Sequence, residues 1–121
     1  MDSERWNKGF ENLKKLMGCE ENIFAGMGDL GDMILEIGFG DLYSRDTFTW
    51  RERQIATMAV QIALGWEPQL KIHMKASLHI GITVKQIEEL LIHTAIYAGF
   101  PAAMNGFHVL QEVCKELDIN D

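Results

Sequence analysis

The stretch from Arg53 to Gly81 constrains the fold more than any other part of the chain. Its pattern predicts two helices that meet at a short elbow. The first helix is apolar on nearly every side, and a helix without a polar face is normally enclosed by other helices. Gly65 is placed to end it, and Pro68 suits the first turn of the second helix, where a missing N–H costs nothing. We therefore expect a helical bundle built around this pair.

A few polar side chains on this pair form the candidate site. Gln69 and His73 are four residues apart on the second helix and share a face, with Trp66 one turn earlier at the elbow. Gln54 and Gln61 are polar side chains of the enclosed first helix, and a buried polar group needs a partner or a ligand. An ordinary imidazole titrates near neutrality, so any chemistry is expected to centre on His73.

Helical periodicity also covers the first third of the chain. Apolar spacing predicts an amphipathic helix over residues 3–17, with Ser3 as its cap. A second, short helix is predicted over residues 29–39, ending near Gly38 or Gly40. The residues that follow are then expected to be a connector.

Two capping signatures mark later helix starts. Residues 49–52 (Thr-Trp-Arg-Glu) and residues 83–86 (Thr-Val-Lys-Gln) each fit a capping box. The second begins a helix that Gly99 closes, and Pro101 opens the last helix. Nowhere does apolar character alternate with period two, so no sheet is expected. The predicted fold is all-α, a compact bundle of about six helices in a single domain spanning residues 1–121.

Charge and composition narrow the function classes. The net charge of −7 argues against nucleic acid and anionic membranes as partners, because both reward clustered Lys and Arg. The first 20 residues lack the apolar run of a signal peptide, and no stretch approaches a membrane span, so a cytoplasmic protein is expected. Cys19 and Cys114 form no C-x-x-C pair, and free thiols are expected.

Several short motifs carry a family resemblance. In chain order they are Phe39-Gly40-Asp41-Leu42-Tyr43-Ser44-Arg45, Arg53-Gln54-Ile55, the His73 to Gly81 spacing, Gly81-Ile82-Thr83 with Gln86-Ile87, and Tyr97-Ala98-Gly99-Phe100-Pro101-Ala102-Ala103. With these motifs, roughly residues 30–115 resemble the carboxymuconolactone decarboxylase family, which shares a superfamily with alkylhydroperoxidase-type disulfide reductases. The resemblance implies an all-helical, alkylhydroperoxidase-like protomer and homo-oligomers, commonly trimers or hexamers, with pockets near subunit contacts.

The sequence departs from that family at the reactive positions. The redox branch carries C-x-x-C before the histidine, and the cysteine positions here are Trp66 and Gln69. Without thiols there, disulfide exchange and peroxide reduction cannot run. The decarboxylase branch usually keeps a glutamate before the histidine and another at the start of the buried helix. Both are glutamine here, Gln69 and Gln54, and glutamine cannot release a proton near neutral pH.

The leading hypothesis is a cofactor-free decarboxylase acting on a small anionic, lactone-like or unsaturated acid. His73 would donate a proton to the carbanion or enolate, Gln69 would fix its ring, and Gln54 and Gln69 could donate hydrogen bonds to the enolate oxygen. The substrate-binding candidates are Trp66, Arg45 and Tyr97.

Two other interpretations stay open. A lone histidine on a mostly apolar helix is usually a satisfied core or interface residue, and the lost glutamates fit a non-catalytic oligomeric module that binds a small molecule or a protein. A thiol-dependent peroxidase is disfavoured because the C-x-x-C pair is absent. His79, His93 and His108 have no metal-ligand spacing, so no metal site is predicted, although histidines of different subunits could meet.

Overall fold

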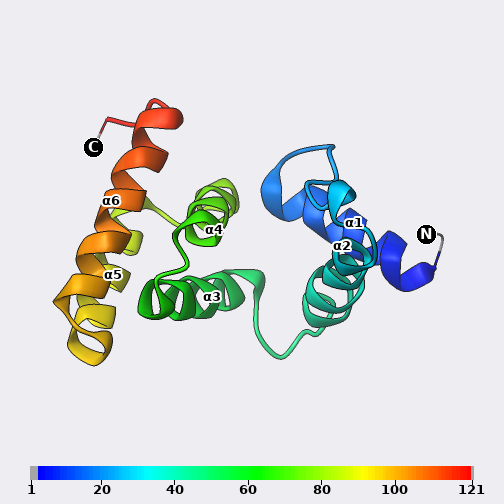
Figure 1. Ribbon diagram of the computed structural model, residues 1–121, viewed down its shortest axis with the longest axis horizontal. Helices are drawn as coiled ribbons and strands as arrows, with labels where there is room; N and C mark the ends of the chain where they lie inside the picture. The colour runs from blue at the N-terminus through cyan, green and yellow to red at the C-terminus, as the bar shows by residue number, and fades with distance from the viewer. Residues whose placement is uncertain (1–2, 121) are drawn as a thin grey trace. The chain divides into compact units, whose positions relative to one another are not determined.

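The computed structural model describes residues 3–120, and every regular element in that range is helical (Figure 1). Six α-helices, one 3-10 helix and one π-helix occur there, and none of these residues forms a strand. The predicted all-α class with about six helices is confirmed. In chain order the elements are α1 (Glu4–Met17), η1 (Ala25–Met27, 3-10), α2 (Asp29–Met33), η2 (Ile34–Leu42, π), α3 (Trp50–Leu64), α4 (Glu67–His79), α5 (Val84–Ala98) and α6 (Phe100–Glu116).

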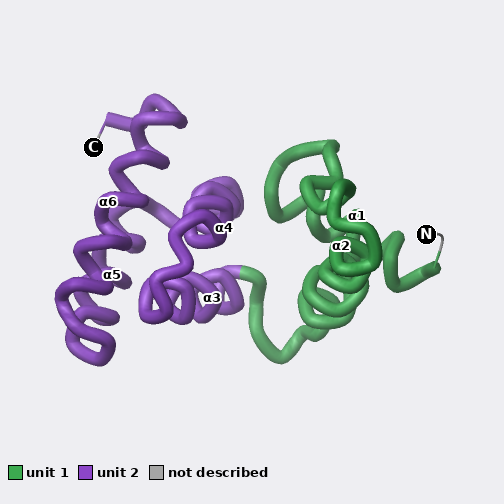
Figure 2. Tube along the Cα trace, in the orientation of Figure 1, with its two compact units in different colours: residues 1–50 green, residues 51–121 purple. Residues whose placement is uncertain are grey.

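The chain forms two compact units, residues 1–50 and residues 51–121 (Figure 2). The first holds the elements from α1 to η2, and the second holds nearly all of α3 together with α4, α5 and α6. The expectation of one domain over residues 1–121 stays a prediction. No helix in the described range is long and apolar enough to cross a membrane.

In the first unit, α1 packs closely against η2. Ser3 caps α1 as predicted, because its Oγ accepts the Trp6 N–H at 3.0 Å. Gly9 and Gly40 allow the two helices to approach: a Cβ on Gly9 would lie 2.0 Å from the Leu35 carbonyl oxygen, and a Cβ on Gly40 would lie 2.7 Å from a backbone oxygen of α1. This contact therefore depends on the absence of two side chains.

The predicted end of the second helix is wrong. Instead of stopping near Gly38 or Gly40, the helix continues as η2 to Leu42. Neither glycine has a positive φ, so neither provides the left-handed cap that ends a helix. Gly40 serves the approach to α1 instead, and the Asn12 side chain donates to the Phe39 carbonyl oxygen at 2.8 Å.

In the second unit, α5 and α6 lie side by side and α4 also packs against α6 (Figure 1). Gly65, with a φ of 73°, follows α3, and Pro68 sits in the first turn of α4, as predicted. The capping box at Thr83 is confirmed by its two reciprocal bonds with Gln86, of 3.0 and 3.1 Å. All four helices contribute to one core, which contains Met58, Ile62, Leu70, Met74, Ile82, Ile87, Leu91, Val109, Leu110 and Val113.

The second unit buries one side of α3, and the expected enclosure of its other side stays a prediction. Met58 and Ile62 face the core, whereas Val60 and Leu64 are 52% and 56% exposed. The reason is that the core of the second unit covers only one side of α3. The polar residues Gln54 and Gln61 are on the buried side, as expected, together with Met58 and Ile62, so the inner face of α3 carries both polar and apolar side chains.

Candidate functional site

The contact at the centre of the site joins α3 to α4. Gln54 on α3 is fully buried, and His73 on α4 is partly buried. The Nδ1 atom of His73 lies 3.2 Å from Oε1 of Gln54. The structure therefore brings together two of the three residues that the sequence proposes as catalytic, and the buried carboxamide holds one edge of the imidazole.

Ser77 is a third member of this cluster, which the sequence reasoning missed. It is fully buried on α4, and its Oγ lies 3.1 Å from Gln54 Oε1, 2.6 Å from the His73 carbonyl oxygen and 3.4 Å from Met58 Sδ. The available signal was its position four residues after His73, which places both side chains on one helix face. A hydroxyl at that position among apolar neighbours needs a hydrogen-bond partner.

Burial sets the charge of the imidazole. Desolvation lowers the pKa of His73 to about 4 from its ordinary 6.5, because the charged ring loses hydration. The ring is therefore neutral at physiological pH and has one N–H donor and one nitrogen acceptor. A neutral ring in the free protein means that any proton it donates to a carbanion must first be taken up.

Gln69 and Trp66 lie near the elbow that precedes His73. The Gln69 side chain is exposed. Trp66, the residue immediately before α4, is 53% exposed. Gln69 is one turn from His73 on the same helix, whereas the carboxamide in contact with the ring belongs to Gln54. The ring-fixing role proposed for Gln69 and the substrate-binding role of Trp66 stay predictions.

The other two substrate-binding candidates lie on different elements. Tyr97 on α5 is 82% exposed, and its ring centroid lies 5.3 Å from that of His93. Arg45 is exposed in the first unit, where it lines a cavity of about 410 Å³ together with Arg5 and Asp41. The structure does not bring Tyr97 into the His73 cluster, and it describes Arg45 within the other unit.

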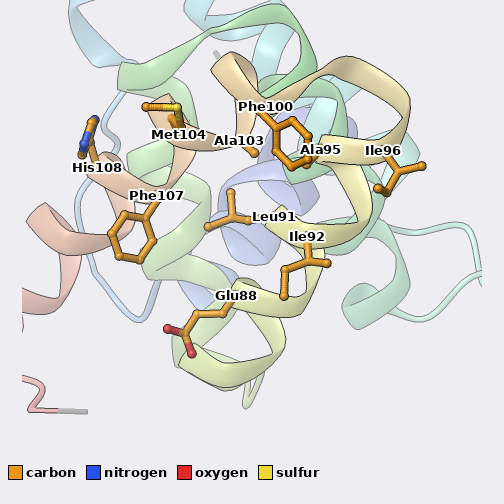
Figure 3. A pocket seen from close by; sticks show the side chains of 10 residues that line it. All are labelled: Glu88, Leu91, Ile92, Ala95, Ile96, Phe100, Ala103, Met104, Phe107 and His108. Atoms are coloured by element: carbon orange, nitrogen blue, oxygen red, sulfur yellow. The ribbon is translucent and has the colours of Figure 1, made fainter.

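The hollows of the second unit include one on α5 and α6 and one beside Met58. The larger, here called the α5–α6 groove, has a volume of about 500 Å³. Figure 3 shows its side chains, and no sequence-predicted site residue is among them. The smaller hollow, of about 290 Å³, is lined by Met58, whose sulfur contacts Ser77. The residues of the groove are Glu88, Leu91, Ile92, Ala95, Ile96, Phe100, Ala103, Met104, Phe107 and His108.

In the described residues, the two cysteines and the other three histidines do not gather into a second cluster like that of His73. Cys19 is in the first unit and Cys114 is on α6, and neither forms a disulfide. His79, His93 and His108 are exposed helix residues. Over residues 3–120 no three histidine, cysteine or acidic side chains gather as metal ligands would.

Comparison with known proteins supports the resemblance seen in the motifs. The sequence model of the carboxymuconolactone decarboxylase family matches residues 28–112. The 4-carboxymuconolactone decarboxylase of Acinetobacter baylyi is 31% identical over 125 aligned positions, covering 98% of this chain and 92% of that protein. The nitrosuccinic acid decarboxylase of Metarhizium robertsii is 23% identical over 86 positions, covering 71% of this chain and 60% of that protein.

Proposed function

Because the chain belongs to the carboxymuconolactone decarboxylase family, we propose that it is a cofactor-free carboxy-lyase for a small anionic acid. The named substrates of the two relatives support a substrate class: one name contains a lactone and the other a nitro group. Both groups withdraw electrons and can accept the pair left when CO₂ departs. The proposed substrate is therefore a lactone-like or unsaturated acid that provides its own electron sink.

His73 is the proposed proton donor, and its contact with Gln54 is the observation that supports this role. The ring is neutral when the site is empty because its pKa is about 4. An anionic substrate beside it favours the imidazolium, so the proton would be taken up as the substrate binds. The C–C bond to the carboxylate then breaks, CO₂ leaves, and the remaining electron pair forms a C–H bond with the proton from His73. The ring returns to its neutral form.

The other candidates have supporting roles in this proposal. Gln69, one turn before His73, would donate an amide hydrogen bond to the enolate oxygen, which a glutamine can do without ionising. Trp66 would provide an apolar surface for the substrate. The substrate-orienting roles of Arg45 and Tyr97 stay predictions from the sequence.

The proposal is tested by CO₂ release from a panel of small lactone and unsaturated acids, including 4-carboxymuconolactone. We expect turnover with at least one acid and a loss of about 100-fold or more in His73→Gln, the range typical of a lost general acid. His79→Gln, an exposed position at the end of the same helix, is the matched control and should keep full activity. Full turnover by His73→Gln would remove His73 from the mechanism.

We also propose that the protein self-associates, as a trimer or hexamer. The support is a set of large apolar side chains that α5 and α6 expose around the groove, with Ile96 72% and Phe100 69% exposed. Monomeric proteins rarely leave a contiguous apolar surface of this kind uncovered. A second copy of the chain, carrying the same apolar surface, is the proposed cover.

A non-catalytic binding module is the alternative, and glutamine at both relay positions, 54 and 69, favours it. Thermal shift separates the two proposals, because a ligand that binds the folded state raises the melting temperature whether or not it reacts. An acid that stabilises the protein without releasing CO₂ would support the module. A dithiol-dependent peroxidase assay is expected to show no activity, and activity requiring Cys19 or Cys114 would contradict both proposals.

A further inference from the structure

We propose that Ser77 is a positioning residue for His73. It holds the Gln54 carboxamide with its oxygen toward the ring, so that Nδ1 carries the hydrogen and Nε2 is the nitrogen that meets the substrate. This proposal rests on the proposed function for its catalytic meaning. Its structural content, the tautomer of one imidazole, stands on the contacts of three side chains.

Geometry supports the arrangement. Gln54 and Ser77 are each fully buried, and they reach one another from different helices, α3 and α4. Gln54 Oε1 lies 3.1 Å from Ser77 Oγ and 3.2 Å from His73 Nδ1. A carboxamide oxygen has two lone pairs, so it can accept from the hydroxyl and from the ring together.

The orientation of the carboxamide decides the tautomer. If it turned by half a rotation, its NH₂ group would face the ring, Nδ1 would become the acceptor, and the hydrogen of the neutral ring would lie on Nε2. With the oxygen facing the ring, Nδ1 donates and Nε2 has the free lone pair. Because Ser77 donates a hydrogen bond to Oε1, it favours the arrangement in which the carboxamide oxygen faces the ring.

The Ser77 hydrogen has three acceptors within reach: the His73 carbonyl oxygen at 2.6 Å, Gln54 Oε1 at 3.1 Å and the weaker acceptor Met58 Sδ at 3.4 Å. The carbonyl is four residues earlier in α4, where the helical pattern also gives it the backbone N–H of Ser77. When the Ser77 hydroxyl points toward Gln54, the His73 carbonyl oxygen therefore still accepts the backbone N–H of Ser77. The same single hydrogen can then fix the carboxamide that contacts the imidazole.

The chemical consequence concerns where the proton comes from. With Nδ1–H in the empty site, Nε2 cannot donate, and it must gain a hydrogen before it can protonate a carbanion. The low pKa of His73 agrees with a ring that is neutral at this stage. The tautomer thus makes Nε2 the atom that takes up a proton together with an anionic substrate and later releases it to carbon.

The test is long-range ¹H–¹⁵N correlation NMR of protein labelled with ¹⁵N-histidine, at neutral pH and without substrate. His73→Gln identifies the His73 signals by their loss. We expect a protonated Nδ1 and an unprotonated Nε2 in the wild type, and a shift of the tautomer ratio toward Nε2–H in Ser77→Ala. A wild-type His73 protonated on Nε2 would overturn the proposal.

Thr94→Val is the matched control, because Thr94 is also buried and its hydroxyl also bonds the carbonyl four residues earlier, at 2.8 Å. Both changes remove one buried helical hydroxyl, yet only Ser77→Ala should alter the His73 tautomer. An unchanged tautomer in Ser77→Ala contradicts the positioning role. Because the spectra are recorded without substrate, failure to release CO₂ would refute the proposed function and leave this result standing.

Discussion

The Nδ1 atom of His73 is held 3.2 Å from a neutral carboxamide, Oε1 of Gln54, at a position where a carboxylate would have brought a charge. Burial then acts on the imidazole without a full opposite charge to offset it, and its pKa falls to about 4. The empty site is therefore neutral in this region. In the proposed reaction, the anionic substrate brings the negative charge that favours protonation of the ring.

Replacing Gln54 with glutamate is the direct test of this relationship. A carboxylate at 3.2 Å would favour the imidazolium, so the pKa of His73 in Gln54→Glu should rise by about 1–3 pH units. NMR titration of the His73 ring measures it. Gln69→Glu is the matched control: its side chain is exposed, solvent screens the new charge, and the rise should be much smaller. A larger rise in Gln69→Glu would mean that Gln69, as the sequence suggested, is the partner of the ring.

Stability should depend on pH through the same residue. Below pH 6.5 the unfolded chain binds a proton at His73, and the folded chain does not bind it until about pH 4, so the free energy of unfolding falls as the pH drops between these values. At about 1.4 kcal/mol per pH unit, the contribution lost is about 3 kcal/mol. Urea unfolding of the wild type and His73→Gln should diverge across this window, the variant lacking this loss. If the free energy of unfolding fell equally in the two proteins from pH 7 to pH 4, the buried His73 ring would not be the cause of the loss.

The sequence was sufficient to predict most helices because their signals are local. Ser3, Gly65, Pro68 and the Thr83 capping box each act within one helical turn, and each is found where it was predicted. The η2 helix was predicted to end too early, because Gly40 is required by a contact with α1 and not by a turn. Long-range packing of that kind leaves no local pattern.

The candidate site was predicted in part for the same reason. His73 stood out as an imidazole on a mostly apolar stretch, and Gln54 as a polar residue on a buried face. Their contact joins two helices, and sequence spacing favoured Gln69, which shares the helix of His73, as the ring partner. Ser77 carried a weak signal, since a serine on a helix is commonly satisfied by a carbonyl of the same helix.

The first unit should tolerate little at Gly9. In Gly9→Ala the new methyl would lie 2.0 Å from the Leu35 carbonyl oxygen, so α1 and η2 must separate, and we expect a loss of about 1–3 kcal/mol of stability. Gly38→Ala is the control on η2: nothing lies within 4 Å of its Cβ, and alanine favours the helix. Chemical denaturation followed by circular dichroism measures both. Equal stability of the two variants would contradict the close approach of α1 and η2.

Self-association should respond to a charge placed on the α5–α6 surface. Ile96 is 72% exposed beside the groove, and Ile96→Glu would bury a carboxylate in the proposed subunit contact. Sedimentation equilibrium should show a trimer or hexamer of 13.8 kDa protomers for the wild type, and for the variant at least roughly a tenfold higher dissociation concentration. Gln111→Glu adds the same charge at an exposed position of α6 outside the groove lining and should leave the assembly unchanged. A wild-type protein that sediments as a monomer at all concentrations would refute the proposed assembly, and an Ile96→Glu variant that assembles normally would place the subunit contact elsewhere.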